Sequence, residues 1–355
     1  MKITTDLSIT SAPHRPFGPS TPWYAPWNSP ITGTAPALVL DFAADAYGTG
    51  GASGTLTSTV ALTRATDATR IGSTGQIETL GPNTARIDYD PATNARQGLL
   101  LESARTNLFV QSGTPAGQTI AVAAVPHVLS FYGTGTITLS GAHTAGVTGT
   151  GAFPVRTTFA FTPTAGDLTL AITGSVSSVQ LEEGDTASSY IPTGAGATQR
   201  GEDVATVPLG SWFNASQGTL VFSGSMAGAQ ANDRIIEIDS GASSTRLSVL
   251  WNSVLSKPQF QVWEAGALQA AVAPGSTAIG FGVPFRVAVA YALNDFAVSL
   301  NGSAVSQDNS GILPSGLTTL RLGRSIWGAQ GLMLAESVVY YPTRLGDAEL
   351  VSLST

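Results

Sequence analysis

The chain has 355 residues, enough for two to three domains that each bury a core. Only 11% of the residues are charged, Gly reaches 40 residues and Cys is absent, which excludes a disulfide framework, a thiolate metal site and a cysteine nucleophile. Lys2 and Lys257 are the only lysines and the formal charge is −7, which argues against a P-loop, a Schiff-base lysine and a nucleic-acid partner.

The first 36 residues are rich in proline yet carry apolar aromatic side chains. No apolar run is long enough for a signal peptide or a membrane span, so we expect neither Sec export nor membrane insertion. The prolines interrupt strand pairing, and aromatic residues in an extended chain favour burial against a surface. We therefore expect an arm that packs on a neighbouring protein or a second subunit, with contacts from Phe17, Trp23, Tyr24 and Trp27. The alternative is that the arm covers a groove of its own domain.

The region 37–205 alternates apolar and polar residues with period 2, as half-buried strands do. In residues 135–141, Ile137 and Leu139 share one face, and the threonines and serine share the other. The glycine-rich run 48–54 predicts a hairpin and not a dinucleotide loop, because no helix follows it. Strands are expected at residues 37–42, 54–65, 127–133, 135–141, 156–163 and 167–173.

The region 206–355 repeats this pattern at short, regular spacing. Eight short strands joined by Gly, Asn and Pro turns predict a two-sheet sandwich or jelly roll, so the whole chain is expected to be all-β and antiparallel. A single helix is expected near Asp347, with Leu345, Leu350 and Leu353 docked on a sheet. The strands are expected at residues 219–226, 234–239, 245–251, 258–264, 285–291, 295–302, 318–323 and 335–341.

Three segments resemble known proteins. The run QGLLLESARTNLF (97–109) resembles a signature of bacteriophage and gene-transfer-agent fibre or head-spike proteins. Residues 179–204 resemble the end of the carbohydrate-binding-module-like sandwich in the same proteins. Residues 210–352, with the motifs VSLNG, LRLG and VVYYPTRLGDAEL, are similar to laminin-G/concanavalin-A-like lectin domains.

The resemblance implies three parts: an anchoring arm (1–36), a region with a carbohydrate-binding-module-like sandwich (37–205) and a lectin-like sandwich (206–355). It implies a protein made in the bacterial cytoplasm and carried on the virion surface. The arm would bind other virion proteins, and the chain would form a trimer or pentamer. Glu102, Arg105 and Asn107 of the signature are expected to lock a strand corner through an Arg–carboxylate pair, with ligand binding as the alternative.

Residues for catalysis are sparse, so we expect no enzyme, no cofactor and no metal site. The three histidines are not near a GxSxG elbow, and HExxH and EF-hand motifs are absent. Glu237 and Asp239 resemble part of a glycoside-hydrolase motif, but Gly241 and Ala242 stand where its third acid is needed. A strand with two acids on one face is the favoured interpretation. A single Ca²⁺ held by loop oxygens stays open as an alternative.

The strand 258–264 is the best candidate for ligand binding. Alternation places Phe260 and Val262 on its apolar face, and Gln259, Gln261 and Trp263 on its polar face. An indole stacks on the C–H face of a sugar, and amides bond its hydroxyls. Trp251 is expected in the core instead.

Further residues extend this hypothesis to a whole protein. Arg324 and Trp327 are expected on the same or an adjacent rim as Trp263, where Arg would suit an acidic polysaccharide. We therefore expect a non-enzymatic virion fibre that binds host surface polysaccharide. A purely structural or capsid-decorating protein and a glycan depolymerase are the alternatives. Trp263 would equally be covered by a neighbouring subunit or by the arm.

Overall fold

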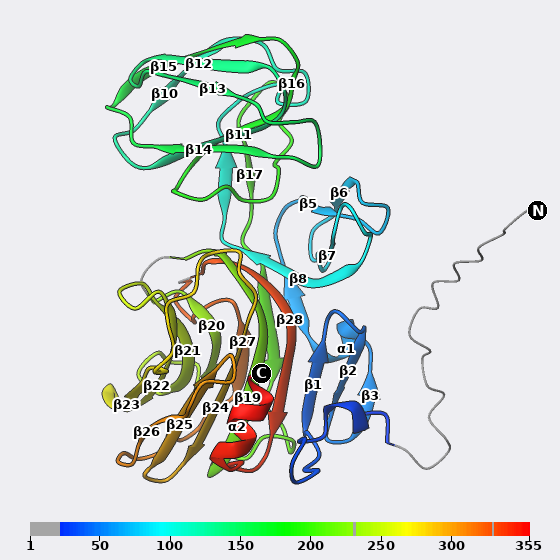
Figure 1. Ribbon diagram of the computed structural model, residues 1–355, viewed down its shortest axis with the longest axis vertical. Helices are drawn as coiled ribbons and strands as arrows, with labels where there is room; N and C mark the ends of the chain where they lie inside the picture. Colours follow the sequence, from blue (N-terminus) through cyan, green and yellow to red (C-terminus); the bar gives the residue numbers. More distant parts are fainter. Residues whose placement is uncertain (1–21, 230–231, 329) are drawn as a thin grey trace, which may run out of the picture.

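The computed structural model describes residues 22–229, 232–328 and 330–355. Nearly all regular structure in these residues is antiparallel β-sheet, as the sequence predicts. Figure 1 shows a large sandwich below, a smaller sandwich above and a small hairpin unit between them at the side.

The first sheet of the large sandwich has ten strands. Its main path runs β26-β25-β24-β19-β28-β1-β2-β3, and β8 joins it by pairing with both β28 and β7. The strands are β1 (Leu38–Asp41), β2 (Ala46–Thr49), β3 (Ala52–Gly54), β7 (Ile87–Tyr89), β8 (Arg96–Glu102), β19 (Gln217–Gly228), β24 (Phe285–Ala292), β25 (Asp295–Leu300), β26 (Ser306–Asp308) and β28 (Leu332–Tyr341).

The second sheet has seven strands in the order β23-β22-β21-β20-β27-β18-β4. Apolar residues of both sheets alternate into one shared core, which includes the buried Trp251 as predicted. The strands are β4 (Ala61–Thr63), β18 (Val204–Pro208), β20 (Arg234–Asp239), β21 (Arg246–Asn252), β22 (Lys257–Glu264), β23 (Ala267–Val272) and β27 (Thr319–Leu322).

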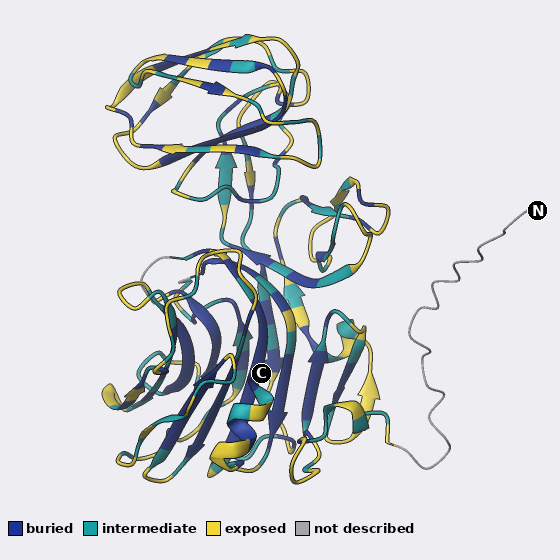
Figure 2. Cartoon of the chain, viewed as in Figure 1, coloured by how far each residue is buried: buried dark blue, intermediate teal, exposed yellow. Residues whose placement is uncertain are grey.

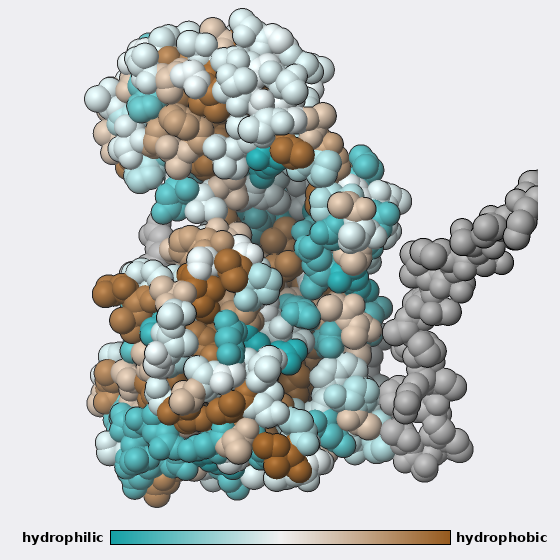
Figure 3. Space-filling view, viewed as in Figure 1, coloured by the Kyte–Doolittle hydropathy of each residue, from teal (hydrophilic) through white to brown (hydrophobic). Residues whose placement is uncertain are grey.

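The smaller sandwich also packs two sheets around its own core. Their orders are β10-β15-β12-β13 and β14-β11-β16. The strands are β10 (Gln118–Val122), β11 (His127–Gly133), β12 (Thr136–Gly141), β13 (Ala145–Thr148), β14 (Thr157–Phe161), β15 (Gly166–Thr173) and β16 (Val176–Glu183). On β12, Ile137 and Leu139 are buried and Thr138 is exposed, as alternation predicts. Figure 3 shows a mostly pale surface on this sandwich, which its Thr, Ser and Gly residues explain.

The smaller sandwich is an insertion into the large one. The chain enters it through β9 (Arg105–Asn107) and leaves through β17 (Thr198–Arg200), and these two strands pair with each other. The hairpin unit consists of β5 (Ala68–Ile71) and β6 (Ile77–Leu80). The expected division between 37–205 and 206–355 does not follow the sheets, because β1 pairs with β28 and β18 (Val204–Pro208) pairs with β4.

The helices are few and short. α2 (Asp347–Leu353) forms as predicted, and it buries Leu350 against the outer face of the ten-stranded sheet together with Leu345. The predicted strand 54–65 is wrong in its first half, where α1 (Leu56–Thr59) replaces it. There the Thr55 side chain accepts from the backbone of Ser58, a local cap that competes with strand pairing. The remaining element is the 3-10 turn η1 (Ala25–Trp27).

Candidate functional site

The outer face of the seven-stranded sheet is polar, although its inner face is a continuous core. Val262 and Phe260 of β22 point into that core, so Gln259, Gln261 and Trp263 share the opposite face. Figure 2 shows that most strand residues of the lower sandwich are buried. The structure thus brings these three predicted residues together.

The polar side chains of β22 form a continuous hydrogen-bonded ladder. Trp263 Nε1 donates to Gln261 Oε1 at 3.1 Å, and Gln261 Nε2 donates to Gln259 Oε1 at 3.3 Å. Asn252 of the neighbouring strand β21 also donates to Gln259 Oε1, at 3.0 Å. The ladder fixes the plane of each amide, which leaves Gln259 Nε2 without a hydrogen-bond partner among the described residues.

Arg246 completes this row, and the sequence argument missed it. Its guanidinium carbon lies 4.7 Å from the centroid of the Trp263 ring, a cation–π contact. Burial and the nearby Arg234 lower the pKa of Arg246. The signal was present in the sequence, because a hairpin turning at residues 252–257 pairs Arg246 with Trp263 across β21 and β22. Ser248, the next outward residue on β21, is buried and its hydroxyl has no partner within the described chain.

The two acids of β20 lie on this same face, as predicted, and both are neutralised. Glu237 accepts from Arg234 Nε at 2.8 Å, and Asp239 accepts from Arg321 Nε at 2.6 Å. Both carboxylates are almost completely buried. An ion-paired carboxylate held in place by arginine is a poor nucleophile or proton donor, so the pair serves the structure of the sheet.

Arg324 and Trp327 lie on the loop after β27, and the strands β20 and β21 separate β27 from the ladder on β22. Arg324 Nη2 forms an ion pair with Glu202 at 2.8 Å, so its charge is partly engaged. Trp327 is 71% exposed. The backbone N–H of Ile326 donates to Glu237 at 2.8 Å, which ties the Trp327 loop to the polar face at its centre. The structure places the two Trp residues on one side of the sheet without bringing them into contact.

The arm residues that the structure describes dock on their own sandwich. Trp23 Nε1 donates to Gly51 O at 2.8 Å, and Trp27 Nε1 donates to Asp41 Oδ2 at 3.0 Å. Trp27 is also packed against the α2 cluster. These contacts match the alternative in which the arm covers a groove of its own domain. Attachment of Trp23, Tyr24 and Trp27 to another virion protein stays a prediction, and Phe17 lies outside the described residues.

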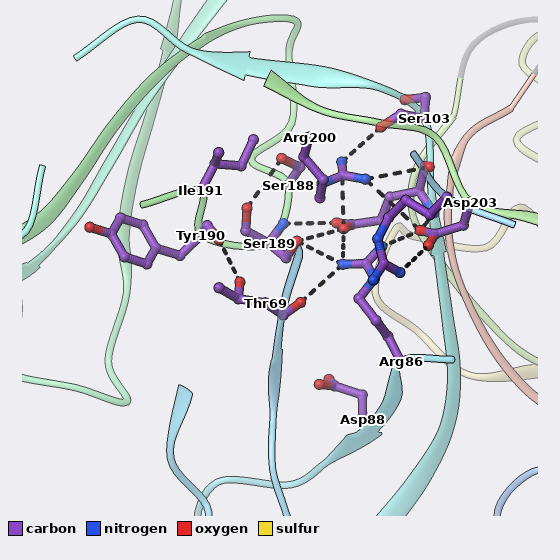
Figure 4. A network of polar contacts seen from close by, with 12 residues as sticks. Thr69, Arg86, Asp88, Ser103, Ser188, Ser189, Tyr190, Ile191, Arg200 and Asp203 are labelled. Carbon is purple, nitrogen blue, oxygen red and sulfur yellow. Dashed lines mark hydrogen bonds and ion pairs between the residues drawn. The ribbon is translucent and has the colours of Figure 1, made fainter. Parts of the chain in front are cut away.

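The signature segment around β8 has a structural role, but not with the expected pair. Glu102 contacts Arg86 Nη1 at 2.6 Å and Arg200 Nη2 at 3.5 Å. Figure 4 shows the polar network around Arg86, Arg200 and Asp203. Arg105 instead donates to the backbone carbonyl of Glu183. Asn107 is fully buried and bonds four backbone groups of the inserted sandwich, those of Phe109, Val179, Leu181 and Ile191.

Among the described residues, no group of three or more His, Asp or Glu side chains is arranged to hold a metal ion. No helix in the described ranges combines the length and the apolar character that a membrane span requires.

Comparisons with known proteins give structural neighbours only. No protein-family model matches the chain, and no curated protein matches it. The chain is similar to CBM40 of the Ruminococcus gnavus IT-sialidase bound to α2,3-sialyllactose, at 14% identity and a TM-score of 0.35, covering 40% of this chain and 83% of that one. It is also similar to domain 4 of an extracellular arabinanase from Geobacillus stearothermophilus in complex with arabinotriose, at 14% identity and a TM-score of 0.34, covering 49% and 83%. We therefore infer what this chain binds from its own residues.

Proposed function

We propose that the protein is a non-enzymatic glycan-binding protein whose binding surface is the outer face of β21 and β22. The observation that carries this proposal is the Trp263 ladder. Its indole is hydrogen-bonded to Gln261 and through it to Gln259, in one row on the strand face that points away from the core. Sugars present apolar C–H faces and a ring of hydroxyls, and this surface offers matching groups of both kinds.

The geometry indicates how such a ligand would sit. Arg246 occupies one side of the Trp263 ring, so a sugar would stack on the surface of the half-buried indole that remains accessible. Gln259 Nε2 would donate to a hydroxyl, because no group of the described chain uses it. Ser248 lies opposite Gln261 across β21 and β22, but its hydroxyl is buried and out of reach of a ligand.

The biological setting is part of the same proposal. The resemblance of residues 97–109 to phage and gene-transfer-agent fibre proteins supports a place on the virion surface, with host polysaccharide as the ligand. Single sugar sites bind weakly, and several copies in a trimer or pentamer would provide avidity. The arm would contact other virion proteins through Phe17, Trp23, Tyr24 and Trp27.

Two alternatives are weaker on specific grounds. A depolymerase needs two carboxyl groups that are free to act, whereas Glu237 and Asp239 are held in ion pairs. A purely structural virion protein would have no use for an ordered amide ladder beside a half-exposed Trp. Covering this face with a second subunit would use the same groups, and the experiment below separates the two cases.

The test is binding of the full chain to immobilised bacterial surface polysaccharides, neutral and acidic, on a glycan array. Trp263→Ala is expected to weaken binding about tenfold, since loss of a stacking surface costs about 1 kcal/mol or more. Val254→Ala is the matched control, because Val254 is 91% exposed at the turn of the same hairpin. Unchanged binding by a folded Trp263→Ala protein, or a shift of that variant from oligomer to monomer with binding intact, would overturn the proposal.

A further inference from the structure

A cavity of about 230 Å³ is lined by residues that do not belong to the Trp263 face. Its wall comes from three parts of the chain: the β5–β6 hairpin unit with Asp88 of β7, the signature strand β8, and the inserted sandwich with Tyr132, Arg156 and residues 187–190. Its size is below the ~300–1,000 Å³ of pockets for drug-sized ligands. An occupant would therefore be a small molecule or one unit of a larger one.

Hydrogen bonds and ion pairs of Glu102 and Arg86 form one wall of the cavity. Glu102 accepts from the Ser189 backbone at 2.8 Å and from the Ser189 hydroxyl at 2.6 Å, and it also pairs with Arg86. Arg86 is itself fully buried and is shared with Asp203. Figure 4 shows this network above Asp88. The Glu102 carboxylate is engaged on both oxygens, so it holds this wall in place and is not the group that a ligand would use.

Three other lining groups keep unused capacity. Tyr132 is only 7% exposed, and its hydroxyl has no hydrogen-bond partner in the described part of the chain. Asp88 accepts from the Ile71 backbone at 2.7 Å through one oxygen, and within the described residues its other oxygen is unpaired. Arg156 uses both terminal nitrogens, on Ser188 and Ser130, while its buried Nε lacks a partner. The Tyr132 hydroxyl and the second oxygen of Asp88 are therefore available to a molecule in the cavity.

The charge balance defines the kind of ligand. Arg70 is paired with Glu78, and Glu102 is paired with arginines, so the remaining charges at the cavity are Asp88 and Arg156. Both act electrostatically on Tyr132, in opposite directions. A cavity with one carboxylate and one guanidinium favours a neutral ligand that both donates and accepts hydrogen bonds. Ile71, Ile77 and Leu100 add apolar surface, which suits the C–H groups of a polyol.

We propose that this cavity is a second binding site, which takes a neutral polyhydroxylated ring of the size of one sugar residue. Asp88 accepts from hydroxyls of the ligand, and Tyr132 donates to one of its oxygens. The occupant is either a free monosaccharide or the terminal unit of a polysaccharide, and both present the same chemistry. The proposal rests on the cavity alone and does not require the Trp263 face to bind anything.

The test uses the full chain and free glucose, galactose and mannose at millimolar concentration, with binding followed by saturation-transfer NMR. Tyr132→Phe removes only a hydroxyl that has no protein partner, so the fold is expected to persist while sugar affinity falls about tenfold. Asp88→Asn keeps an oxygen for the Ile71 N–H and is expected to weaken binding similarly. Tyr89→Phe, the same change on β7 but outside the cavity lining, is expected to have no effect.

The outcomes separate the two sites. A signal that survives Trp263→Ala but weakens in Tyr132→Phe supports the cavity, whatever the glycan array shows for the outer face. A signal that Trp263→Ala removes and Tyr132→Phe leaves intact assigns the sugar to the outer face and overturns the cavity site. Absence of binding for all three sugars also overturns it. Comparing each free sugar with its polysaccharide distinguishes a monosaccharide site from a chain-end site.

Discussion

Two neighbouring carboxylates, Asp88 and Glu102, show how the surroundings of a residue decide its charge. The pKa of Asp88 is raised to about 6, because burial and the Glu102 charge raise it more than the Ile71 N–H, Arg86 and Arg70 lower it. Burial would also raise the pKa of Glu102, but Arg200 and Arg86 hold it well below its usual range. Asp88 lacks a direct ion pair among the described residues, and Glu102 has two.

This contrast predicts an unusual dependence of stability on pH. Because the folded pKa of Asp88 is raised from 3.8 to about 6, its favourable contribution is fully present below pH 3.8 and is lost as the pH rises through 6. Asp88→Asn is therefore expected to stabilise the protein by about 1–3 kcal/mol at pH 7 and to be neutral near pH 4. Urea unfolding of both proteins between pH 4 and 7.5 measures the difference, from which the Glu102 contribution cancels. Parallel curves for the two proteins would contradict the assignment.

At the scale of elements, the hairpin β21–β22 uses alternation to assign its two tryptophans different roles. Trp251 is 2% exposed in the shared core, and the centroid of its ring lies 5.4 Å from that of Phe281. Trp263 lies on the outer face and packs only against Arg246 among the ring contacts of the described chain. Both assignments follow from local period-2 patterning, which is why the sequence predicted them.

Paired alanine substitutions test these roles by stability. Trp251→Ala is expected to lower the free energy of unfolding by about 3–5 kcal/mol, as other core Trp truncations do. Trp263→Ala is expected to cost about 1 kcal/mol, mainly the lost cation–π contact with Arg246. Chemical denaturation of the two variants measures this order. A larger loss for Trp263→Ala would show that the outer face is a packing surface and not an exposed one.

At the scale of the whole molecule, sequence patterns do not predict which distant segments of the chain will contact one another. Strands such as β19 and β25 were predictable because their signal is local. The insertion was not, since β1 pairs with β28 across some 300 residues of sequence, and nothing in either strand specifies its partner. The buried cluster of Arg86, Glu102 and Asp203, here called the junction, could not be predicted for the same reason. Its three residues meet only after three segments of the chain have folded together. Adjacent residues such as Glu102 and Arg105 suggested a pairing that the strand directions do not allow.

We expect the junction to couple the stability of the large sandwich, the hairpin unit and the inserted sandwich. Glu102→Gln keeps the size of the side chain but leaves Arg86 and Arg200 with one acid fewer in a fully buried site. Removing one partner of a buried ion pair costs about 3–5 kcal/mol. The expected result is a lower melting temperature and faster hydrogen exchange in β8, in β17 and in the backbone around Ser189, which Glu102 holds directly.

A matched control lies on the neighbouring hairpin. Glu78 pairs with Arg70 at 2.6 Å, but the Glu78 side chain is 44% exposed, and exposed pairs are worth about 0–1 kcal/mol. Glu78→Gln should therefore leave the melting temperature nearly unchanged. Because Glu102 at the end of β8 contacts both Arg86, which precedes β7, and Ser189 of the inserted sandwich, its loss should loosen the insertion before either core unfolds. Simultaneous exchange throughout both sandwiches in Glu102→Gln would instead show that the two cores unfold as one cooperative unit.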